Sequence, residues 1–460
     1  MEQLSINEIV NSCNGTLISG SIDQRIEGIS IDSRTIKPGD LFIALKGENF
    51  DGHDFIKSSF RKGGVGAIVS KSGDYEKTDK VIIKVEDTLT CLQRIAEYYR
   101  KRFTLKVIGI TGSSGKTTTK EMIATLLSKR YSVLKSHKNY NNEIGVPLTL
   151  LGLEKAHQIA VIEMGMNAIG EIEDLSKISH PDIGLITNIG DAHIGFLSTR
   201  EKIANEKFCL IKNLPRDGIA ILNADDPLII KMKDGMDLKD IITFGIEKKA
   251  KTFASNIEMD KYGTKFLLDG RYWVRMKTFG IHNIYNAIAA TSCAKAFGID
   301  YSEIVEGLEH FKPLSMRGEI IEIQNLRIID DAYNANPQSM KKAIDTICNF
   351  KDGKLILILG DMLELGEKEK VAHLEIGKYV ASSKVDILVT VGNLSKSIAE
   401  GASIAGFPKK DIYTFLSNED IAEFLLSIQE PCTVLIKGSR KMKLEEIITK
   451  IKERCQVRCT

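Results

Sequence analysis

The sequence lacks the features that mark several large classes of protein. Its 63 lysines and arginines nearly balance 61 aspartates and glutamates, and the net charge of +2 implies no strong field for nucleic acid or an acidic membrane. No apolar run approaches the roughly 18 residues that a membrane-spanning helix needs. The opening residues, MEQLSINEIV, lack the basic and apolar regions of a secretory signal. We therefore expect a cytoplasmic protein without nucleic-acid binding or membrane insertion.

Patterns of cysteine and histidine that build disulfides or zinc sites are also missing. The eight cysteines are scattered without C-x-x-C, and only Cys455 and Cys459 are close together. None of the eight histidines forms H-E-x-x-H. We interpret the cysteines as reduced thiols rather than a disulfide or zinc framework. The 460 residues, 43% apolar and 27% charged, otherwise have the composition of an ordinary globular chain of two to four domains.

The most informative stretch is VIGITGSSGKTTTKE, residues 107–121. An apolar run predicts a buried strand, a glycine-rich turn follows, and residues 120–129 predict a helix. This order directs backbone N–H groups and the positive end of a helix at an anion. Lys116 would reach β- and γ-phosphates, and the Thr117 hydroxyl would face Mg²⁺. A strict phosphate loop has glycine where Ile110 stands, so a chance glycine turn is the alternative. The predicted cradle is Gly112, Ser113, Ser114, Gly115, Lys116, Thr117 and Thr118.

The rest of the chain divides into α/β units. Residues 1–84 form a small one, and an amphipathic helix over 87–103 joins it to the next. Residues 85–313 alternate apolar strands and helices, which predicts a mainly parallel sheet with a short antiparallel excursion over 255–270. A proline ends a helix pattern at 313. Residues 314–460 repeat the rhythm without G-x-G-x-x-G, so we expect a Rossmann-like unit that is not a dinucleotide site.

Polar residues collect where predicted strands end, which is where α/β sheets bind ligands. Glu163 follows one buried strand and supplies the oxygen ligand that Mg²⁺ needs. His193 follows the next strand; it is an atypical Mg²⁺ ligand and could equally begin a helix. The asparagine-rich loop 139–147 contains Asn142 and Glu143, and it is either a ligand-facing loop or a capping turn.

Three further stretches carry charged or polar groups. Ser33 and Arg34 lie before a Pro-Gly turn, where a guanidinium suits a diphosphate but a solvated turn is the plainer interpretation. Arg317 could reach nucleotide phosphates from the last unit. DDAYNANP, residues 330–337, is too polar for a mere turn. Lys207 lies on a predicted helix and is plainly interpreted as a surface lysine. If buried beside a metal, however, it could lose its proton and take up CO₂ as a carbamate.

Together these stretches resemble the Mur ligase family of ATP-dependent amino-acid ligases, over essentially the whole chain. DDAYNANP with GDMLELG points to the branch that adds D-alanyl-D-alanine. The absence of glycine at position 110 is normal for this family. The similar motifs, in chain order, are ITGSSGKTTTKE, KNYNNEIGVPLTL, EMGM, TNIGDAHIG, GIHNIYNAIAA, RGE, DDAYNANP, GDMLELG and IKGSR.

The resemblance implies three domains: 1–84 for the UDP-sugar, 85–313 for ATP, and 314–460 closing over ATP and the amino substrate. It implies two Mg²⁺ sites, served by Thr117, Glu163 and His193. Lys207 falls where the family carries a carbamylated lysine that bridges a metal, although relatives place an acidic residue where this chain has Cys209.

The resemblance also implies roles around the nucleotide. Asn283 would meet adenine, Arg317 the phosphates and Asp331 the ribose. The catalytic residues would be Lys116, Lys207, His193 and Arg317. We expect substrate contacts at Ser33, Arg34, Asn142, Glu143, Tyr333, Asn334 and Asn336.

The implied reaction is amide formation through an acyl phosphate. The carboxylate of UDP-MurNAc-tripeptide would attack the γ-phosphorus of ATP, and the amine of D-Ala-D-Ala would then attack the acyl carbon. Such an acid–amino-acid ligase would serve peptidoglycan precursor synthesis, and hence cell shape and cell division. The alternatives are a sister ligase such as folylpolyglutamate synthase and a nucleotide switch that does not ligate. We expect a monomer, and the third residue of the tripeptide, diaminopimelate or lysine, stays open.

Overall fold

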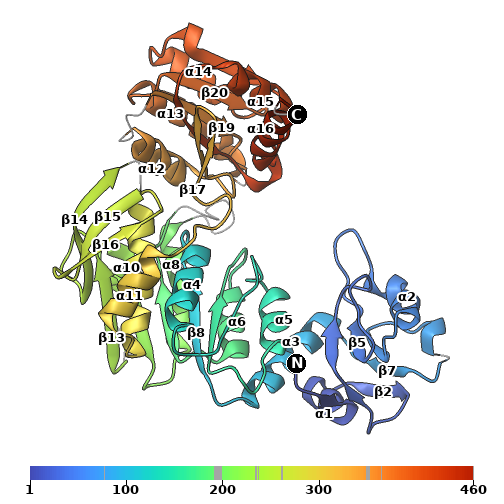
Figure 1. Cartoon of the computed structure of the whole chain (residues 1–460). Coiled ribbons are helices and arrows are strands. Elements are labelled where there is room, and N and C mark those ends of the chain that lie inside the picture. Colours follow the sequence, from blue (N-terminus) through green and yellow to red (C-terminus); the bar gives the residue numbers. More distant parts are fainter. Residues whose placement is uncertain are drawn as a thin grey trace.

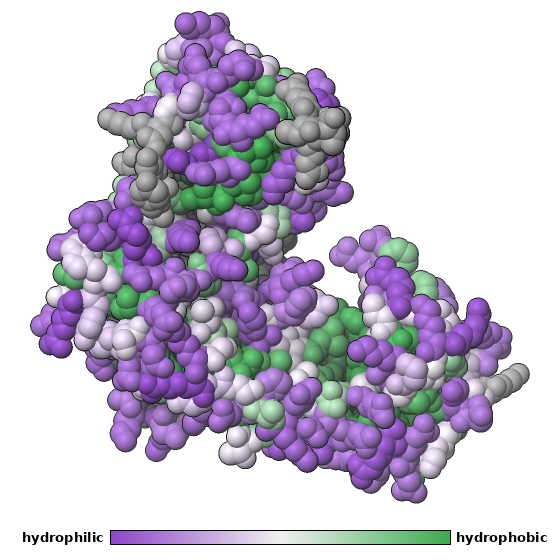
Figure 2. All heavy atoms as spheres, in the orientation of Figure 1, coloured by the Kyte–Doolittle hydropathy of each residue, from purple (hydrophilic) through white to green (hydrophobic). Residues whose placement is uncertain are grey.

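The computed structural model describes residues 1–76, 78–190, 199–233, 236, 238–260, 263–348, 353–363 and 365–458. These residues form three α/β units, each with its own sheet, and one two-stranded ribbon (Figure 1). The blue N-terminal unit and the orange-red C-terminal unit flank the central one and lie apart from each other in this view (Figure 1). Figure 2 shows a wide hollow between them, above the central unit.

The N-terminal unit comprises β1 (Leu4–Ser5), α1 (Ile6–Cys13), β2 (Thr16–Ser19), β3 (Arg25–Ile26), β4 (Gly28–Ser30), β5 (Asp40–Ile43), α2 (Ile56–Arg61), β6 (Gly66–Val69) and β7 (Val81–Lys84). Its sheet has the order β2-β7-β6-β5-β4, with β2–β7 antiparallel and the other pairs parallel. Helix α1 begins with a capping box, because the Ser5 hydroxyl and the Glu8 carboxylate each accept from the other residue's N–H.

Helix α3 (Thr88–Lys101) connects this unit to the central one. The Asp87 carboxylate accepts from the Thr90 N–H and starts the helix. Tyr99 is fully buried; its hydroxyl donates to the Leu153 carbonyl at 2.7 Å and accepts from the Glu2 N–H at 2.6 Å. The two units therefore share one apolar core around α3.

The central unit comprises β8 (Lys106–Thr111), α4 (Lys116–Leu127), β9 (Val133–Lys135), α5 (Gly145–Leu151), β10 (Ile159–Glu163), α6 (Glu171–Ser179), β11 (Ile183–Ile186), α8 (Arg200–Lys212), β12 (Ile219–Asn223), α9 (Pro227–Lys233), β13 (Asp240–Gly245), β14 (Thr252–Asp260), β15 (Gly263–Leu268), β16 (Tyr272–Met276), α10 (Ile281–Ala296) and α11 (Tyr301–Glu309). The strand order is β16-β15-β14-β13-β12-β11-β8-β10-β9, parallel from β9 to β14 and antiparallel at β15 and β16.

Helices cover both faces of this sheet, which explains its continuous apolar strands. In β10, Ala160 and Ile162 belong to the core under α3, α5, α6 and α8. Ile159 and Val161 belong to the core under α4, α10 and α11. The loops that leave the carboxyl ends of β8, β10, β11 and β12 therefore gather at one edge.

The C-terminal unit comprises β17 (Glu319–Ile323), β18 (Leu326–Asp330), α12 (Pro337–Ile347), β19 (Lys354–Gly360), α13 (Glu369–Ala381), β20 (Ile387–Val391), α14 (Lys396–Ile404), β21 (Ile412–Phe415), α15 (Asn418–Ser427), β22 (Cys432–Lys437) and α16 (Glu445–Arg458). The order is β17-β18-β22-β19-β20-β21, with β17 antiparallel to β18. Helices α12, α13 and α14 cover one face, and α15 and α16 cover the other.

The sequence predictions of elements are largely confirmed. The helix expected over 87–103 is α3, and the antiparallel excursion expected over 255–270 is the β14–β15–β16 meander of 252–276. The helix expected to begin at 120 begins at Lys116 instead, because Gly115 adopts the left-handed conformation and turns the chain directly into α4. Among the described residues no helix is both long enough and apolar enough to cross a membrane.

Candidate active site

A cavity of about 490 Å³ lies at the carboxyl edge of the central sheet, facing the C-terminal unit. The loops after β8, β10, β11 and β12 and the start of α10 form its walls on the central side. The loop between β18 and α12, the first turns of α12 and the end of β22 close it from the other side. The cavity thus lies at the edge where parallel sheets bind ligands, and two units build it.

The loop after β8 is held open by two glycines. Gly112 has a φ of +149°, and a Cβ there would lie 1.8 Å from the Thr187 hydroxyl. Gly115 has a φ of +81°, and a Cβ there would lie 2.3 Å from Asn286 Oδ1. The first N–H groups of α4 have no acceptor within the helix, so they and the helix dipole favour an anion in the cavity. The predicted cradle therefore has the geometry of a phosphate site.

Asn188, at the end of β11, holds the rest of the loop. Its carbonyl accepts from the Ser113 N–H at 3.0 Å, and its Oδ1 accepts from the Ser114 N–H at 3.1 Å. The Thr187 hydroxyl donates to the Ser114 carbonyl at 2.6 Å. The residues that follow β11 thus hold the loop that follows β8.

Lys116 folds back over the loop, where Nζ donates to the Gly112 carbonyl at 2.9 Å. Burial lowers the pKa of Lys116, the Glu163 carboxylate opposes that shift, and the Arg317 guanidinium adds to it. The ammonium therefore lies between the loop and the end of β10, and an entering phosphate would give it a counter-charge.

Glu163, at the end of β10, has one occupied and one free oxygen. Oε1 accepts from the Thr117 hydroxyl at 3.1 Å and from Asn141 Nδ2 at 2.9 Å. Oε2 is buried and receives no hydrogen bond from the residues that the structure describes. A buried carboxylate oxygen without a donor, next to a hydroxyl, fits the oxygen ligands that Mg²⁺ takes. The described residues contain no group of three or more His, Cys, Asp and Glu placed to hold a metal, so water and phosphate oxygens would complete the shell.

Arg317 reaches the cavity from the C-terminal unit. Its Nη2 donates to the Thr117 hydroxyl at 3.2 Å, and its guanidinium carbon lies 3.8 Å from the centre of the Tyr333 ring. Asp331 lines the same wall, where its Oδ2 accepts from Lys437 Nζ at 2.5 Å. Lys437 also donates to the Asn334 carbonyl at 3.1 Å. The structure therefore brings Thr117 and Arg317 together across 200 positions of sequence.

The start of α10 forms the wall beside the loop. Asn283 Nδ2 donates to the Phe279 carbonyl at 2.8 Å, and Asn286 Nδ2 donates to Asn283 Oδ1 at 3.2 Å. Burial lowers the pKa of His282 to about 4, although the Asp331 carboxylate opposes the shift. The three side chains thus present neutral polar groups to the cavity, a suitable lining for an uncharged heterocycle.

Lys207 is buried in α8, with 1% of its surface exposed, so its interpretation as a surface lysine is wrong. Burial and the nearby Lys116 ammonium lower the pKa of Lys207 well below its ordinary value. Within the described ranges it forms no hydrogen bond or ion pair, and it is not among the cavity-lining residues. Cys209, two positions on, is partly exposed; burial and the nearby Glu206 carboxylate raise the pKa of its thiol.

Other predicted residues divide between the cavity and its surroundings. Tyr333, Asn334 and Asn336 line it, and Asn336 also caps α12 through the Ser339 N–H. The remaining predicted substrate residues lie outside it. They are Ser33, Arg34 (exposed and paired with Asp32), Asn142 (which accepts from the Gly145 N–H) and Glu143. His193 lies outside the described residues.

Several lining residues escaped the sequence analysis. Asn141 rather than Asn142 contacts Glu163, and which asparagine of the run points inward depends on the turn before α5. Asp225 and Asp226 follow β12, so the strand-end signal could have found them. Asp226 accepts from the Ile189 N–H at 2.7 Å and ties the β12 loop to the β11 loop.

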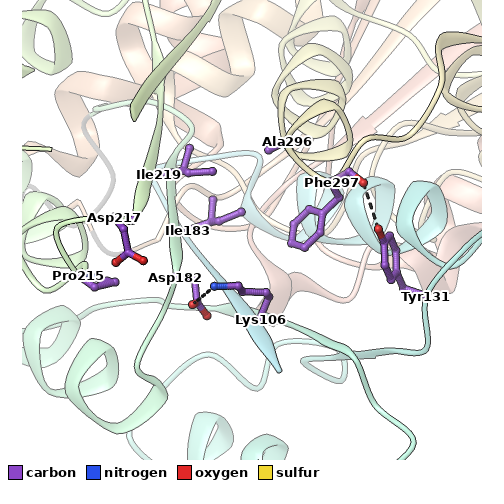
Figure 3. Close-up of a pocket in the computed structure, with 10 residues that line it drawn as sticks. Lys106, Tyr131, Asp182, Ile183, Pro215, Asp217, Ile219, Ala296 and Phe297 are labelled. Carbon is purple, nitrogen blue, oxygen red and sulfur yellow. Dashed lines mark hydrogen bonds and ion pairs between the residues drawn. The ribbon is translucent and has the colours of Figure 1, made fainter. Parts of the chain in front are cut away.

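A second hollow, of about 350 Å³, lies at the opposite edge of the central sheet, where β8, β11 and β12 begin (Figure 3). There the Lys106 ammonium pairs with Asp182 at 2.8 Å, and the Tyr131 hydroxyl donates to the Phe297 carbonyl at 3.1 Å (Figure 3). These groups already satisfy one another. We therefore place the chemistry at the carboxyl edge.

Comparison with known proteins relates the chain that builds this cavity to one protein family. Residues 25–100 match the Mur ligase family catalytic domain, 110–294 the Mur ligase middle domain, and 316–440 the Mur ligase glutamate ligase domain. The chain is 38% identical over 456 residues to UDP-N-acetylmuramoyl-tripeptide–D-alanyl-D-alanine ligase of Bacillus subtilis, covering 97% of this chain and 98% of that protein.

The chain belongs to the Mur ligase family. Solved structures agree. MurF from Acinetobacter baumannii superposes with a TM-score of 0.90 at 33% identity, covering 98% of this chain and 99% of that one. MurF ligase from Thermotoga maritima, in complex with ADP, gives 0.82 at 29% identity, covering 94% and 98%. In this Mur ligase the cavity lies between the middle and glutamate ligase domains, since Lys116 and Glu163 fall in one and Arg317 and Asp331 in the other.

Proposed function

We propose that this Mur ligase adds D-alanyl-D-alanine to UDP-N-acetylmuramoyl-tripeptide, with ATP hydrolysed to ADP and phosphate, in peptidoglycan precursor synthesis. The observation that carries the proposal is the two-domain cavity, in which a phosphate loop faces an arginine and an aspartate of the next domain. The 38% sequence identity to the Bacillus subtilis ligase, over nearly the full length of both chains, supports the choice of substrates.

ATP binds with its phosphates in the cradle of residues 112–118. Lys116, Arg317 and the N–H groups of α4 receive the phosphates. The negative charge of the phosphates balances the positive charge of the two side chains. Asn283 receives adenine, and Asp331, held by Lys437, receives the ribose. The phosphates are thereby fixed between two domains, so closure of the C-terminal domain aligns them for transfer.

The first step joins two anions. A carboxylate oxygen of the tripeptide attacks the γ-phosphorus, the bond to the bridging oxygen breaks, and ADP leaves with the electron pair. Lys116 and Arg317 offset the charge repulsion and stabilise the transferring phosphoryl group. The amine of D-Ala-D-Ala then attacks the acyl phosphate carbon, an amide forms, and phosphate leaves with loss of a proton. Activation is necessary because a carboxylate is a poor electrophile.

Mg²⁺ fits the residues at the end of β10. Glu163 and the Thr117 hydroxyl would hold it, and His193 would serve a second site. When bound, it supplies positive charge that lowers the barrier to phosphoryl transfer. The burial of Lys207 and its lowered pKa favour the neutral amine, which can attack CO₂ and lose a proton to form a carbamate.

We further propose that residues 1–84, 85–313 and 314–460 are the three domains and that the first binds the UDP-sugar, with Ser33 and Arg34 near the diphosphate. Asn142, Glu143, Tyr333, Asn334 and Asn336 would contact the peptide parts of the substrates. The enzyme would work as a cytoplasmic monomer.

The deciding experiment measures phosphate release from ATP by the full chain with UDP-MurNAc-tripeptide, with and without D-Ala-D-Ala. Release that needs both substrates, with a new amide found by mass spectrometry, supports the proposal. Release stimulated by glutamate and a folate instead would indicate folylpolyglutamate synthase. ATP binding without release under any of these conditions would indicate a nucleotide switch.

A further inference from the structure

A buried lysine lies one helical turn beyond Lys116 in α4. Lys120 has no exposed surface, although lysine is almost never fully buried unless it is paired. Residues four apart lie on the same face of a helix, so Lys120 lies below the phosphate cradle. The phosphate-binding role of the loop does not account for its burial.

The Lys120 ammonium links three segments next to the cavity. Nζ donates to the Ser136 carbonyl at 2.7 Å and to the Lys138 carbonyl at 3.0 Å. The Ser136 hydroxyl accepts in turn from the Glu163 N–H at 3.0 Å. The contacts form a closed set that joins α4, the segment after β9 and the end of β10.

The same ammonium lies 3.7 Å from Glu163 Oε2, which is too far for a hydrogen bond. It therefore offsets the charge of the carboxylate without occupying that oxygen. Thr117 and Asn141 both donate to Oε1. Asn141 comes shortly after Lys138, whose carbonyl Lys120 holds. Lys120 therefore also fixes the position of the asparagine side chain that donates to Oε1.

We propose that Lys120 is a positioning residue for Glu163 as a ligand of a divalent cation. It anchors the segment of Ser136 and Lys138 so that Asn141 and Thr117 stay on Oε1, and Oε2 is left for the cation. The inference rests on the proposed function in one respect, that nucleotide and divalent cation bind here together.

A lysine that only satisfied two carbonyls would affect stability and leave the metal dependence of nucleotide binding unchanged. The chain offers a matched control in Lys135, which pairs with the Glu121 carboxylate. Lys120 also approaches that carboxylate, at 3.3 Å. Among the described residues, however, Lys135 forms no hydrogen bond or ion pair with Glu163. Lys135→Met therefore removes a neighbouring charge without disturbing the proposed support.

The test measures the affinity of the full chain for ADP by calorimetry, once with MgCl₂ and once with EDTA. The Kd in EDTA divided by the Kd in MgCl₂ reports how strongly Mg²⁺ and nucleotide help each other bind. We expect Lys120→Met to lower this ratio by about tenfold, the size typical of outer-shell changes at metal sites. Lys135→Met should leave the ratio within twofold of wild type, and both variants should bind ADP normally in EDTA.

A folded Lys120→Met protein with a ratio less than threefold below wild type overturns the proposal. If that variant does not fold, Ser136→Ala decides by the same threshold, because it breaks the closed set at the Glu163 N–H. A wild-type protein that binds ADP equally in both buffers overturns this inference and the proposed cation site together. Normal coupling in wild type with unchanged coupling in the folded variant overturns this inference alone.

Discussion

Arg317 offers a direct test of how the two domains cooperate. It is the guanidinium of the C-terminal domain that contacts the phosphate loop, through Nη2 and the Thr117 hydroxyl at 3.2 Å. Its guanidinium carbon lies 3.8 Å from the centre of the Tyr333 ring, and this contact restricts where the guanidinium can point. Within the described part of the chain no carboxylate pairs with it, so its charge is available for a ligand. We expect Arg317→Ala to lower the ligation rate strongly and Arg317→Lys to lower it less.

The magnitudes follow from the contacts. Removing one donor that stabilises charge in a transition state costs about 3–4 kcal/mol, or about 10²–10³ in rate. A lysine keeps the charge but loses the contact of the guanidinium with the Tyr333 ring. Such contacts contribute about 0.5–2 kcal/mol. We therefore expect Arg317→Lys to retain roughly a tenth of the wild-type rate, and Arg317→Ala a hundredth or less.

The assay is phosphate release with saturating ATP and both substrates, with thermal unfolding measured alongside. Tyr333→Leu removes the ring and leaves the guanidinium. Because Tyr333 is also a proposed substrate contact, the rate of this variant is compared at saturating substrate, where it should match that of Arg317→Lys. Arg317→Ala activity within tenfold of wild type would refute the role in charge stabilisation. Equal losses in the alanine and lysine variants would refute the importance of the charge and indicate a geometric role.

Three further outcomes are expected. Lys116→Ala should abolish ligation because it removes the cation nearest the loop, and ligation within tenfold of wild type would contradict this. The ligation rate should rise from pH 7 to 9, as an α-amino group with a pKa of about 8 loses its proton; a flat profile would mean that amine attack does not limit the rate. Burial raises the pKa of Asp330 from 3.8 to about 6, so the folded state binds this proton more tightly than the unfolded state does. The resulting contribution to the free energy of unfolding is therefore present below about pH 4 and is lost as the pH rises to about 6. Asp330→Asn should therefore raise the free energy of unfolding by about 2–3 kcal/mol at pH 7 and hardly at pH 3.5, as urea titrations would show; an equal gain at both pH values would contradict the assignment.

Local chemistry made the glycine turn between β8 and α4 predictable. Gly112 and Gly115 are required by positive φ angles and by close neighbours, and Lys116 follows from the same short stretch. Strand ends were predictable too, because continuous apolar runs stop at Glu163 and at Asp330. The start of α4 was placed four residues late, since the sequence does not show that Gly115 turns the chain straight into the helix.

The neighbours of these residues depend on contacts between distant segments. Lys207 is interpreted from the sequence as a surface lysine and no sequence pattern singles out Lys120, yet both are buried, because the helices that carry them press those faces against the sheet. Asn141 rather than Asn142 reaches Glu163, since one residue of rotation in a turn exchanges the side chain that points inward. Periodicity cannot report such a rotation outside a regular element.

By itself the sequence determined most of the elements, the glycine turn between β8 and α4 and the kinship with Mur ligases, because each of these is written in short, contiguous patterns. Only the tertiary structure decided that Arg317 meets Thr117, that Lys437 holds Asp331, and that no described residue donates to one oxygen of Glu163. Those facts depend on how two sheets face each other across a cavity. The free energy of that arrangement is spread over the packing of whole domains, and no local stretch of sequence encodes it.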